Sequence, residues 1–210
     1  MAGSLISPRL LSGKYAAVPG GIIVALLALP PLRQVLEANM LLHMLVQFPL
    51  LAGAGILIGS ALPGGFRSRL MAWNHSGISG LLLAACITTF WMIPRALDEA
   101  LTQPWIEALK FFSLTLGVGT ALAVSWRAAG FLIQGFFIGN LLPMMAVAGW
   151  LYVESPVRLC NSYLVSQQEM TGTALILISI GAAIVWLASF FMQSGPGDKC
   201  LLADCSIKNI

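Results

Sequence analysis

The sequence predicts an all-α polytopic membrane protein, built as one bundle of six transmembrane helices with both termini in the cytoplasm. Hydrophobic residues make up 58% of the 210 residues and charged residues only 9%, whereas a soluble domain carries about 25% charged residues. Six apolar runs come close to the roughly 20 residues that a helix needs to cross the hydrocarbon. A soluble globule is therefore excluded, and the small net charge of +3 gives no reason to expect a nucleic-acid partner.

The predicted spans follow one another with short connections, so consecutive helices are expected to be antiparallel neighbours. The first span is followed by Pro30, Pro31 and Arg33 without a small-residue cleavage pattern, which favours a retained span over a signal peptide. We assign residues 1–192 to a single transmembrane domain and residues 193–210 to a flexible cytoplasmic tail. The predicted spans are residues 15–32, 39–62, 70–94, 105–126, 130–153 and 171–192.

The basic residues predict the orientation of these spans. Seven of the eleven Lys and Arg residues lie on the side of the two termini, which predicts that this side is cytoplasmic in the bacterial inner membrane. Arg127 is expected in a tight cytoplasmic turn between the fourth and fifth spans. The seven are Arg9, Lys14, Arg67, Arg69, Arg127, Lys199 and Lys208, and the other four are Arg33, Arg95, Lys110 and Arg158.

Several features of the spans predict packing instead of chemistry. Small residues four apart, in the pairs Gly55 with Gly59 and Gly135 with Gly139, predict close contacts between helices. Asn140, followed by Pro143, is expected to need a polar partner from another helix and to mark a kink. Glu107 and Lys110 lie one turn apart, where they are expected to pair with each other and to anchor the fourth span at the outer interface.

One helical face near the outer end of the second span carries soft metal ligands. Met40, His43, Met44 and Gln47 lie at i, i+3, i+4 and i+7 and therefore share this face. Thioether and imidazole ligands suit Cu(I), which predicts a copper site. The alternative is that the methionines fill gaps in the core and that His43 makes hydrogen bonds to other helices. The predicted metal ligands are His43, Met40, Met44, Met92 and Met144, with Gln47, Gln167 and Gln168 as supporting residues.

The sequence shows no sign of an enzyme or of a disulfide framework. Nucleophile elbows, phosphate-binding loops, dinucleotide fingerprints and paired intramembrane carboxylates are absent from it. The topology places Cys86 in the membrane, Cys160 outside, and Cys200 and Cys205 in the cytoplasmic tail, so Cys160 has no partner on its own side. We therefore expect a non-catalytic protein.

Four segments together resemble the CtaG family of cytochrome c oxidase assembly factors. Residues 37–47 are similar to its His-Met-x-x-His stretch, and residues 90–101 resemble its Trp-His-x-Pro segment with the amphipathic loop that follows. Residues 106–112 resemble the start of its next helix, and residues 166–172 its Asp-Gln-x-x-x-Gly helix entrance. The resemblance implies a polytopic membrane protein linked to copper delivery.

The chain departs from the family pattern at three of these positions. Gln47 and Met92 stand where the family has histidines, and Ser166 stands where it has an aspartate. Carried over residue by residue, His43 with Met44 is the best-retained position, and Gln167 or Gln168 is a second match. The resemblance therefore implies either a softer, methionine-rich site or a scaffold that has lost its metal.

Three functions follow as hypotheses. The first is a copper-handling assembly factor for a respiratory or other membrane metalloenzyme. The second is an accessory subunit that binds no metal and supplies helix contacts to the other membrane subunits of a redox complex. The third, a haem-binding cytochrome, would pair His43 with a methionine such as Met144. A transporter is disfavoured, because the spans carry almost no ionisable residues at mid-depth.

Overall fold

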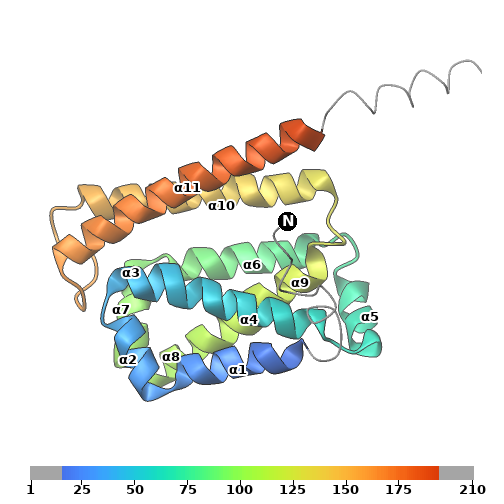
Figure 1. The fold of residues 1–210 in the computed structure, drawn as a ribbon, viewed down its shortest axis with the longest axis horizontal. Helices are drawn as coiled ribbons and strands as arrows, with labels where there is room; N and C mark the ends of the chain where they lie inside the picture. The colour runs from blue at the N-terminus through green and yellow to red at the C-terminus, as the bar shows by residue number, and fades with distance from the viewer. Residues whose placement is uncertain (1–15, 194–210) are drawn as a thin grey trace, which may run out of the picture.

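The computed structural model describes residues 16–193, and every regular element in that range is helical (Figure 1). The predictions for the cytoplasmic tail, Cys200, Cys205, Arg9, Lys14, Lys199 and Lys208 lie outside the described residues. Four stretches are long and apolar enough to cross a membrane. They are Met40–Ser60, Pro104–Ser125, Phe131–Glu154 and Val165–Ser189. The prediction of a helical, membrane-integral bundle is therefore confirmed at this level.

These four stretches correspond to the second, fourth, fifth and sixth predicted spans. The stretch Met40–Ser60 comprises α3 (Met40–Leu42), the π-helix η1 (His43–Gln47) and α4 (Phe48–Ser60). The stretch Pro104–Ser125 comprises α8 (Pro104–Phe112), the π-helix η2 (Ser113–Thr120) and α9 (Ala121–Ser125). The stretch Phe131–Glu154 is α10, and the stretch Val165–Ser189 lies within α11 (Val165–Gln193), which begins six residues before the predicted 171–192.

The first predicted span is wrong as a single helix. Residues 15–32 contain α1 (Ala17–Ala28) and the beginning of α2 (Pro30–Glu37), and the two helices are bent by 72°. Leu29 takes an extended conformation because Pro30 and Pro31 follow it. At 1.5 Å per residue the 12-residue α1 is about 18 Å long, too short to cross about 30 Å of hydrocarbon alone.

The third predicted span is broken in the same way. Residues 70–94 contain the end of α5 (Gly64–Trp73) and all of α6 (Ile78–Trp91), and these helices are bent by 84°. Gly77 makes the turn with a φ of 73°, a left-handed conformation that glycine adopts without steric cost. The Asn74 side chain stabilises the break, because its Oδ1 accepts from the Gly80 amide at 3.1 Å and its Nδ2 donates to Ser125 Oγ at 2.7 Å. With each bent pair counted as one crossing the chain has up to six spans, and the six-span count stays a prediction.

Small residues hold the helices close together, as one of the two predicted pairs anticipates. A Cβ at Gly55 of α4 would collide with the carbonyl oxygen of Thr115 in η2, and one at Gly59 would lie 2.9 Å from the Thr120 Cα. A Cβ at Gly135 of α10 would lie 3.4 Å from the Trp186 ring of α11, whereas a Cβ at Gly139 would meet nothing within 4 Å. Gly55 and Gly59 thus both lie at a helix contact, as predicted. Of the second pair, only Gly135 does.

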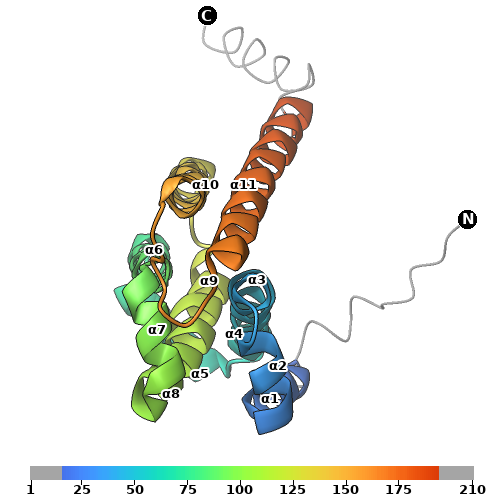
Figure 2. The same ribbon diagram turned by 90° about the vertical axis from the view of Figure 1, so that its left-hand side faces the viewer.

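The helices divide into a main body and a hairpin. Helices α10 and α11 run antiparallel beside the rest of the bundle, joined to it by the turn at Arg127 between α9 and α10 (Figures 1 and 2). That turn confirms the predicted position of Arg127. α7 (Pro94–Thr102) lies with α2, α3 and the start of α8 at one end of the bundle, and α5 and the end of α9 lie at the other (Figure 1). We call the first of these ends the α2–α7 end.

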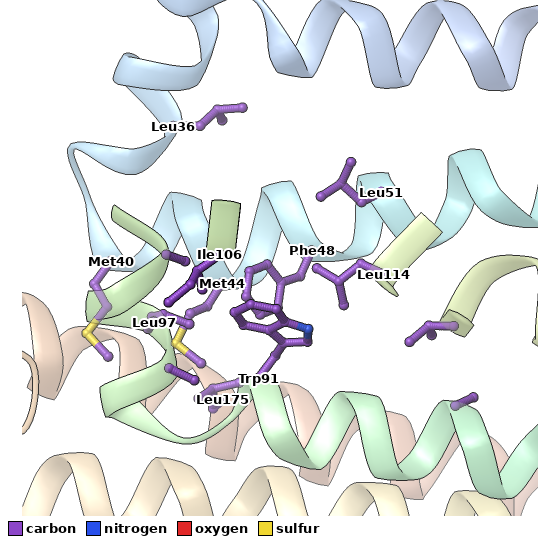
Figure 3. Close-up of a cluster of buried hydrophobic side chains, with 14 of the residues drawn as sticks. Leu36, Met40, Met44, Phe48, Leu51, Trp91, Leu97, Ile106, Leu114 and Leu175 are labelled. Atoms are coloured by element: carbon purple, nitrogen blue, oxygen red, sulfur yellow. The ribbon is translucent and has the colours of Figure 1, made fainter. Parts of the chain in front are cut away.

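An apolar core fills the interior near the α2–α7 end. Aromatic, aliphatic and methionine side chains from five or more helices meet there, with Trp91 1% exposed and edge-on to the ring of Phe48 (Figure 3). The core includes Leu36, Met40, Met44, Phe48, Leu51, Trp91, Leu97, Ile106, Leu114 and Leu175.

Candidate functional site

A cluster of polar and charged side chains lies beside this core, at the same end of the bundle. Helix α2 contributes Arg33 and Glu37, the π-helix η1 contributes His43 and Gln47, and α8 contributes Glu107 and Lys110. Tyr163 comes from the connection that precedes α11. We call these seven residues the Glu37–Lys110 cluster. Tyr163 and Glu37, which are hydrogen-bonded to each other, lie 126 residues apart in the sequence.

Lys110 is the centre of the cluster and is completely buried, with 0% of its surface exposed. Its Nζ lies 2.7 Å from Glu37 Oε1, 3.0 Å from His43 Nε2 and 3.5 Å from Gln47 Oε1. An ammonium group has three hydrogens to donate, and these three acceptors match them. Each hydrogen of the Lys110 ammonium therefore has an acceptor, one of them a carboxylate and the other two neutral groups.

The contacts of Lys110 also fix the protonation of the buried His43 ring. Because Nε2 accepts from the ammonium, the proton of the neutral imidazole is on Nδ1, which donates to the Tyr163 hydroxyl at 2.7 Å. The Tyr163 hydroxyl in turn donates to the Glu37 carbonyl oxygen at 2.9 Å. A continuous hydrogen-bonded path thus leads from Lys110 through His43 and Tyr163 back to α2.

A second ion pair lies at the rim of the cluster. Arg33 Nη1 lies 2.8 Å from a Glu107 carboxylate oxygen, and Arg33 Nε lies 3.7 Å from the Glu37 carboxylate. The prediction that Glu107 and Lys110 pair with each other and anchor the span at the interface is therefore wrong. Each of them pairs with α2 instead, and Lys110 lies inside the protein because Glu37, His43 and Gln47 offer it acceptors there.

The connection before α11 contains two buried acidic groups. Burial raises the pKa of the Tyr163 hydroxyl, and the nearby Glu37 carboxylate raises it further. Burial likewise raises the pKa of the Cys160 thiol to about 12, with a smaller contribution from the Asp98 carboxylate. Both groups therefore stay protonated at neutral pH, so the Tyr163 hydroxyl is available as a hydrogen-bond donor.

The structure brings together part of the predicted copper face. Met40 and Met44 are buried with His43 on the same segment, but their side chains lie in the apolar core among Leu97 and Ile106 (Figure 3). Both ring nitrogens of His43 are already engaged, Nε2 by Lys110 and Nδ1 by Tyr163. For His43 to bind Cu(I), one of these two contacts has to break. The copper site stays a prediction.

The other two predicted ligands, Met92 and Met144, make polar contacts with residues other than His43. Met92 packs against the edge of the apolar core, and its carbonyl oxygen accepts from the Tyr152 hydroxyl at 3.1 Å. The Met144 sulfur lies 2.9 Å from the hydroxyl of Thr89 on α6.

The predicted supporting glutamines have different roles. Gln47 belongs to the cluster, where its Nε2 lies 3.4 Å from Glu37 Oε1. Gln168 is buried but bridges backbone groups, because it accepts from the Leu159 amide at 2.9 Å and donates to the Tyr152 carbonyl at 3.0 Å. Gln167 is half-buried, and its carbonyl oxygen accepts from Thr171.

Sequence reasoning missed Glu37, Lys110 and Tyr163 as members of the site. A usable signal was present, because a lysine inside an apolar run is costly without a partner and the segment just before His43 carries Glu37. Nothing in the sequence pattern pointed to Tyr163.

Within residues 16–193 no group of three or more His, Cys, Asp or Glu side chains is placed to hold a metal ion. Comparison of the sequence with models of known protein families, with curated proteins and with solved structures finds no match.

Proposed function

We propose that the protein is a non-catalytic accessory subunit of a membrane redox complex, which supplies helix contacts to other membrane subunits and holds no metal at His43. The redox nature of the complex rests on the resemblance of the sequence to the oxidase assembly factors. The contact function rests on one residue of α10, and the absence of a metal at His43 rests on Lys110.

Asn140 is the observation that carries the contact function. It lies near the middle of α10, its side chain is exposed, and among residues 16–193 its amide has no hydrogen-bond partner. Lipid tails offer no hydrogen-bonding groups, so a lone amide at this depth is costly unless another protein supplies a partner. Gly139, also exposed, leaves room for a neighbouring backbone to approach.

The contact between Lys110 and His43 supports a metal-free cluster. A Cu(I) ion on Nε2 would have to displace an ammonium group that lies 3.0 Å away. The displaced charge would lose an acceptor in a buried setting, and it would repel the bound cation. Copper handling is supported by one feature, the shared buried segment of Met40, His43 and Met44.

Co-purification from native membranes tests the contact function. We expect the wild-type protein to retain subunits of a redox enzyme in stoichiometric amounts and the Asn140→Leu variant to lose them. Val185→Leu, an exposed apolar position on α11, is the matched control and should retain the subunits. Equal retention by wild type and by Asn140→Leu would contradict the assignment of this surface.

Metal analysis tests the second part of the proposal. The wild-type protein and the His43→Ala variant should both lack stoichiometric copper after gentle purification and after titration with Cu(I). One copper per wild-type chain, lost in His43→Ala, would instead establish the copper-handling function.

A further inference from the structure

A large groove lies on the side of the bundle, between α1 and the continuous segment formed by α8 and η2. Its volume is about 730 Å³, which falls within the usual range for sites that bind small molecules. Its lining is almost entirely apolar, apart from Arg33 and Glu107 and the hydroxyl of Thr115. Gly21, Ala25 and Ala28 form the α1 wall, and a Cβ at Gly21 would meet nothing within 4 Å.

The dimensions of the groove suit one lipid chain in one leaflet. Its residues on the α8–η2 side run from Pro104 to Leu116, which corresponds to about 18 Å at 1.5 Å per residue. One leaflet of hydrocarbon is about 15 Å thick. Arg33 and Glu107 lie at the end of the groove where α8 begins, at the level expected for a headgroup.

The charges at this end are of both signs. The Arg33 side chain is 33% exposed and the Glu107 side chain 16%, so both are accessible from the groove. Arg33 uses Nη1 for Glu107, and its buried Nε lies 3.7 Å from the Glu37 carboxylate, whereas its Nη2 makes no hydrogen bond within residues 16–193. A guanidinium group with unused donors binds phosphate, and a carboxylate accepts from a primary ammonium.

Thr115 adds a polar position within the apolar part of the groove. It is 5% exposed, and its Oγ1 has no hydrogen-bond partner within residues 16–193. Other threonines in these helices, such as Thr88 and Thr171, donate to the carbonyl four residues earlier. Thr115 lies in the π-helix η2, a kind of local distortion that is frequent at functional sites.

From the charge pair, the length and the apolar lining we infer that the groove binds one phospholipid with a phosphate and a primary ammonium in its headgroup. Arg33 holds the phosphate, Glu107 accepts from the ammonium, and one acyl chain lies along α1 and η2. A phosphatidylethanolamine headgroup meets this description. A phosphatidylcholine headgroup lacks the N–H donors for Glu107, and a phosphatidylglycerol headgroup lacks the cation.

Lipid retention measured by native mass spectrometry tests the inference. The probe is the wild-type protein in nanodiscs that contain equal amounts of phosphatidylethanolamine, phosphatidylcholine and phosphatidylglycerol. We expect one phosphatidylethanolamine to remain bound after release, with a preference of roughly tenfold over the other two lipids, as one charged hydrogen bond would give. Glu107→Gln should remove the preference over phosphatidylcholine.

A pair of variants on α1 separates the groove from the general lipid surface. Ala25→Phe fills the groove and should abolish retention, whereas Ile22→Phe, which changes an exposed residue of the same helix outside the groove lining, should not. Helix content and monodispersity of both variants confirm that they fold. Equal retention of the three lipids, retention of an isoprenoid quinone instead, or retention that survives Ala25→Phe would overturn the inference.

Discussion

At the scale of single residues, Lys110 shows how a charge becomes part of the interior of a membrane protein. Its neighbours were not evident from spacing along one helix, because Glu37, His43 and Gln47 come from another part of the chain. The i, i+3, i+4, i+7 spacing predicted that Met40, His43, Met44 and Gln47 share a face, and all four are buried. The periodicity of a sequence predicts which residues share a helix face, but it does not predict which side chains of other helices pack against that face.

Replacing Lys110 by Met should destabilise the protein strongly. The substitution removes the ammonium group 2.7 Å from the Glu37 carboxylate and leaves this largely buried carboxylate with weaker contacts, to Arg33 at 3.7 Å and to Gln47 at 3.4 Å. Loss of one partner costs up to about 3–5 kcal/mol in comparable buried pairs. Arg95→Met is the control, because Arg95 pairs with Glu99 at 3.2 Å but its side chain is 88% exposed, and such a pair contributes about 0–1 kcal/mol. Unfolding in mixed detergent measures both variants. Equal stability losses would show that the cluster is not a buried ion pair in solution.

Cys160 should be unreactive in the folded protein. Its thiol is 1% exposed, donates to the Pro94 carbonyl at 3.6 Å, and has a pKa raised from 9.0 to about 12. A thiol with a raised pKa stabilises the fold fully below its unfolded pKa, and this contribution is lost as the pH rises from 9.0 towards about 12.

Iodoacetamide labelling checks this expectation in a variant in which Cys86, Cys200 and Cys205 are replaced by Ser. The folded protein should be labelled slowly even at pH 9, and the unfolded protein rapidly. The wild-type protein should also lose stability relative to Cys160→Ser above that pH. Rapid labelling of the folded protein would mean that Cys160 is accessible.

At the scale of elements, the sequence predicted the four continuous spans because each is a long apolar run without internal breaks. The prediction of a single helix is wrong for the first and third spans, because the apolar run there continues across the residues at which the chain bends. Pro30 and Pro31 end the helix before them, and Asn74 and Gly77 make a break whose stability depends on Ser125 of another helix. The hydropathy of a segment does not show a contact that a distant part of the chain makes with it.

Two glycines of α4 should respond oppositely to alanine. Gly55→Ala places a methyl group against the Thr115 carbonyl of η2, so the helices must separate at a cost of about 1–3 kcal/mol. Gly53→Ala meets nothing within 4 Å and should be neutral, or more stable by up to about 1 kcal/mol, because alanine favours the helix. Thermal unfolding of both variants in one detergent tests the contact. A Gly55→Ala variant as stable as Gly53→Ala would place the α4–η2 contact elsewhere.

At the scale of the whole molecule, the structure places the predicted outer residues at one end. The Glu37–Lys110 cluster, α7 and the connection before α11 lie together at the α2–α7 end, and the turn at Arg127 lies at the other end (Figure 1). This separation agrees with the prediction that successive loops lie at opposite ends of the bundle. The agreement holds whichever end faces the cytoplasm.

The excess of basic residues on the side of the termini predicts that the α2–α7 end faces away from the cytoplasm. Cys160 lies at this end but is too buried to report it, whereas Val157 in the same connection is 62% exposed. In a background with Ser at positions 86, 200 and 205, Val157→Cys should react with a membrane-impermeant maleimide in intact spheroplasts. Arg127→Cys, exposed in the turn between α9 and α10, should react only after permeabilisation. The opposite pattern would invert the topology, and the cluster and the headgroup end of the groove would then face the cytoplasm.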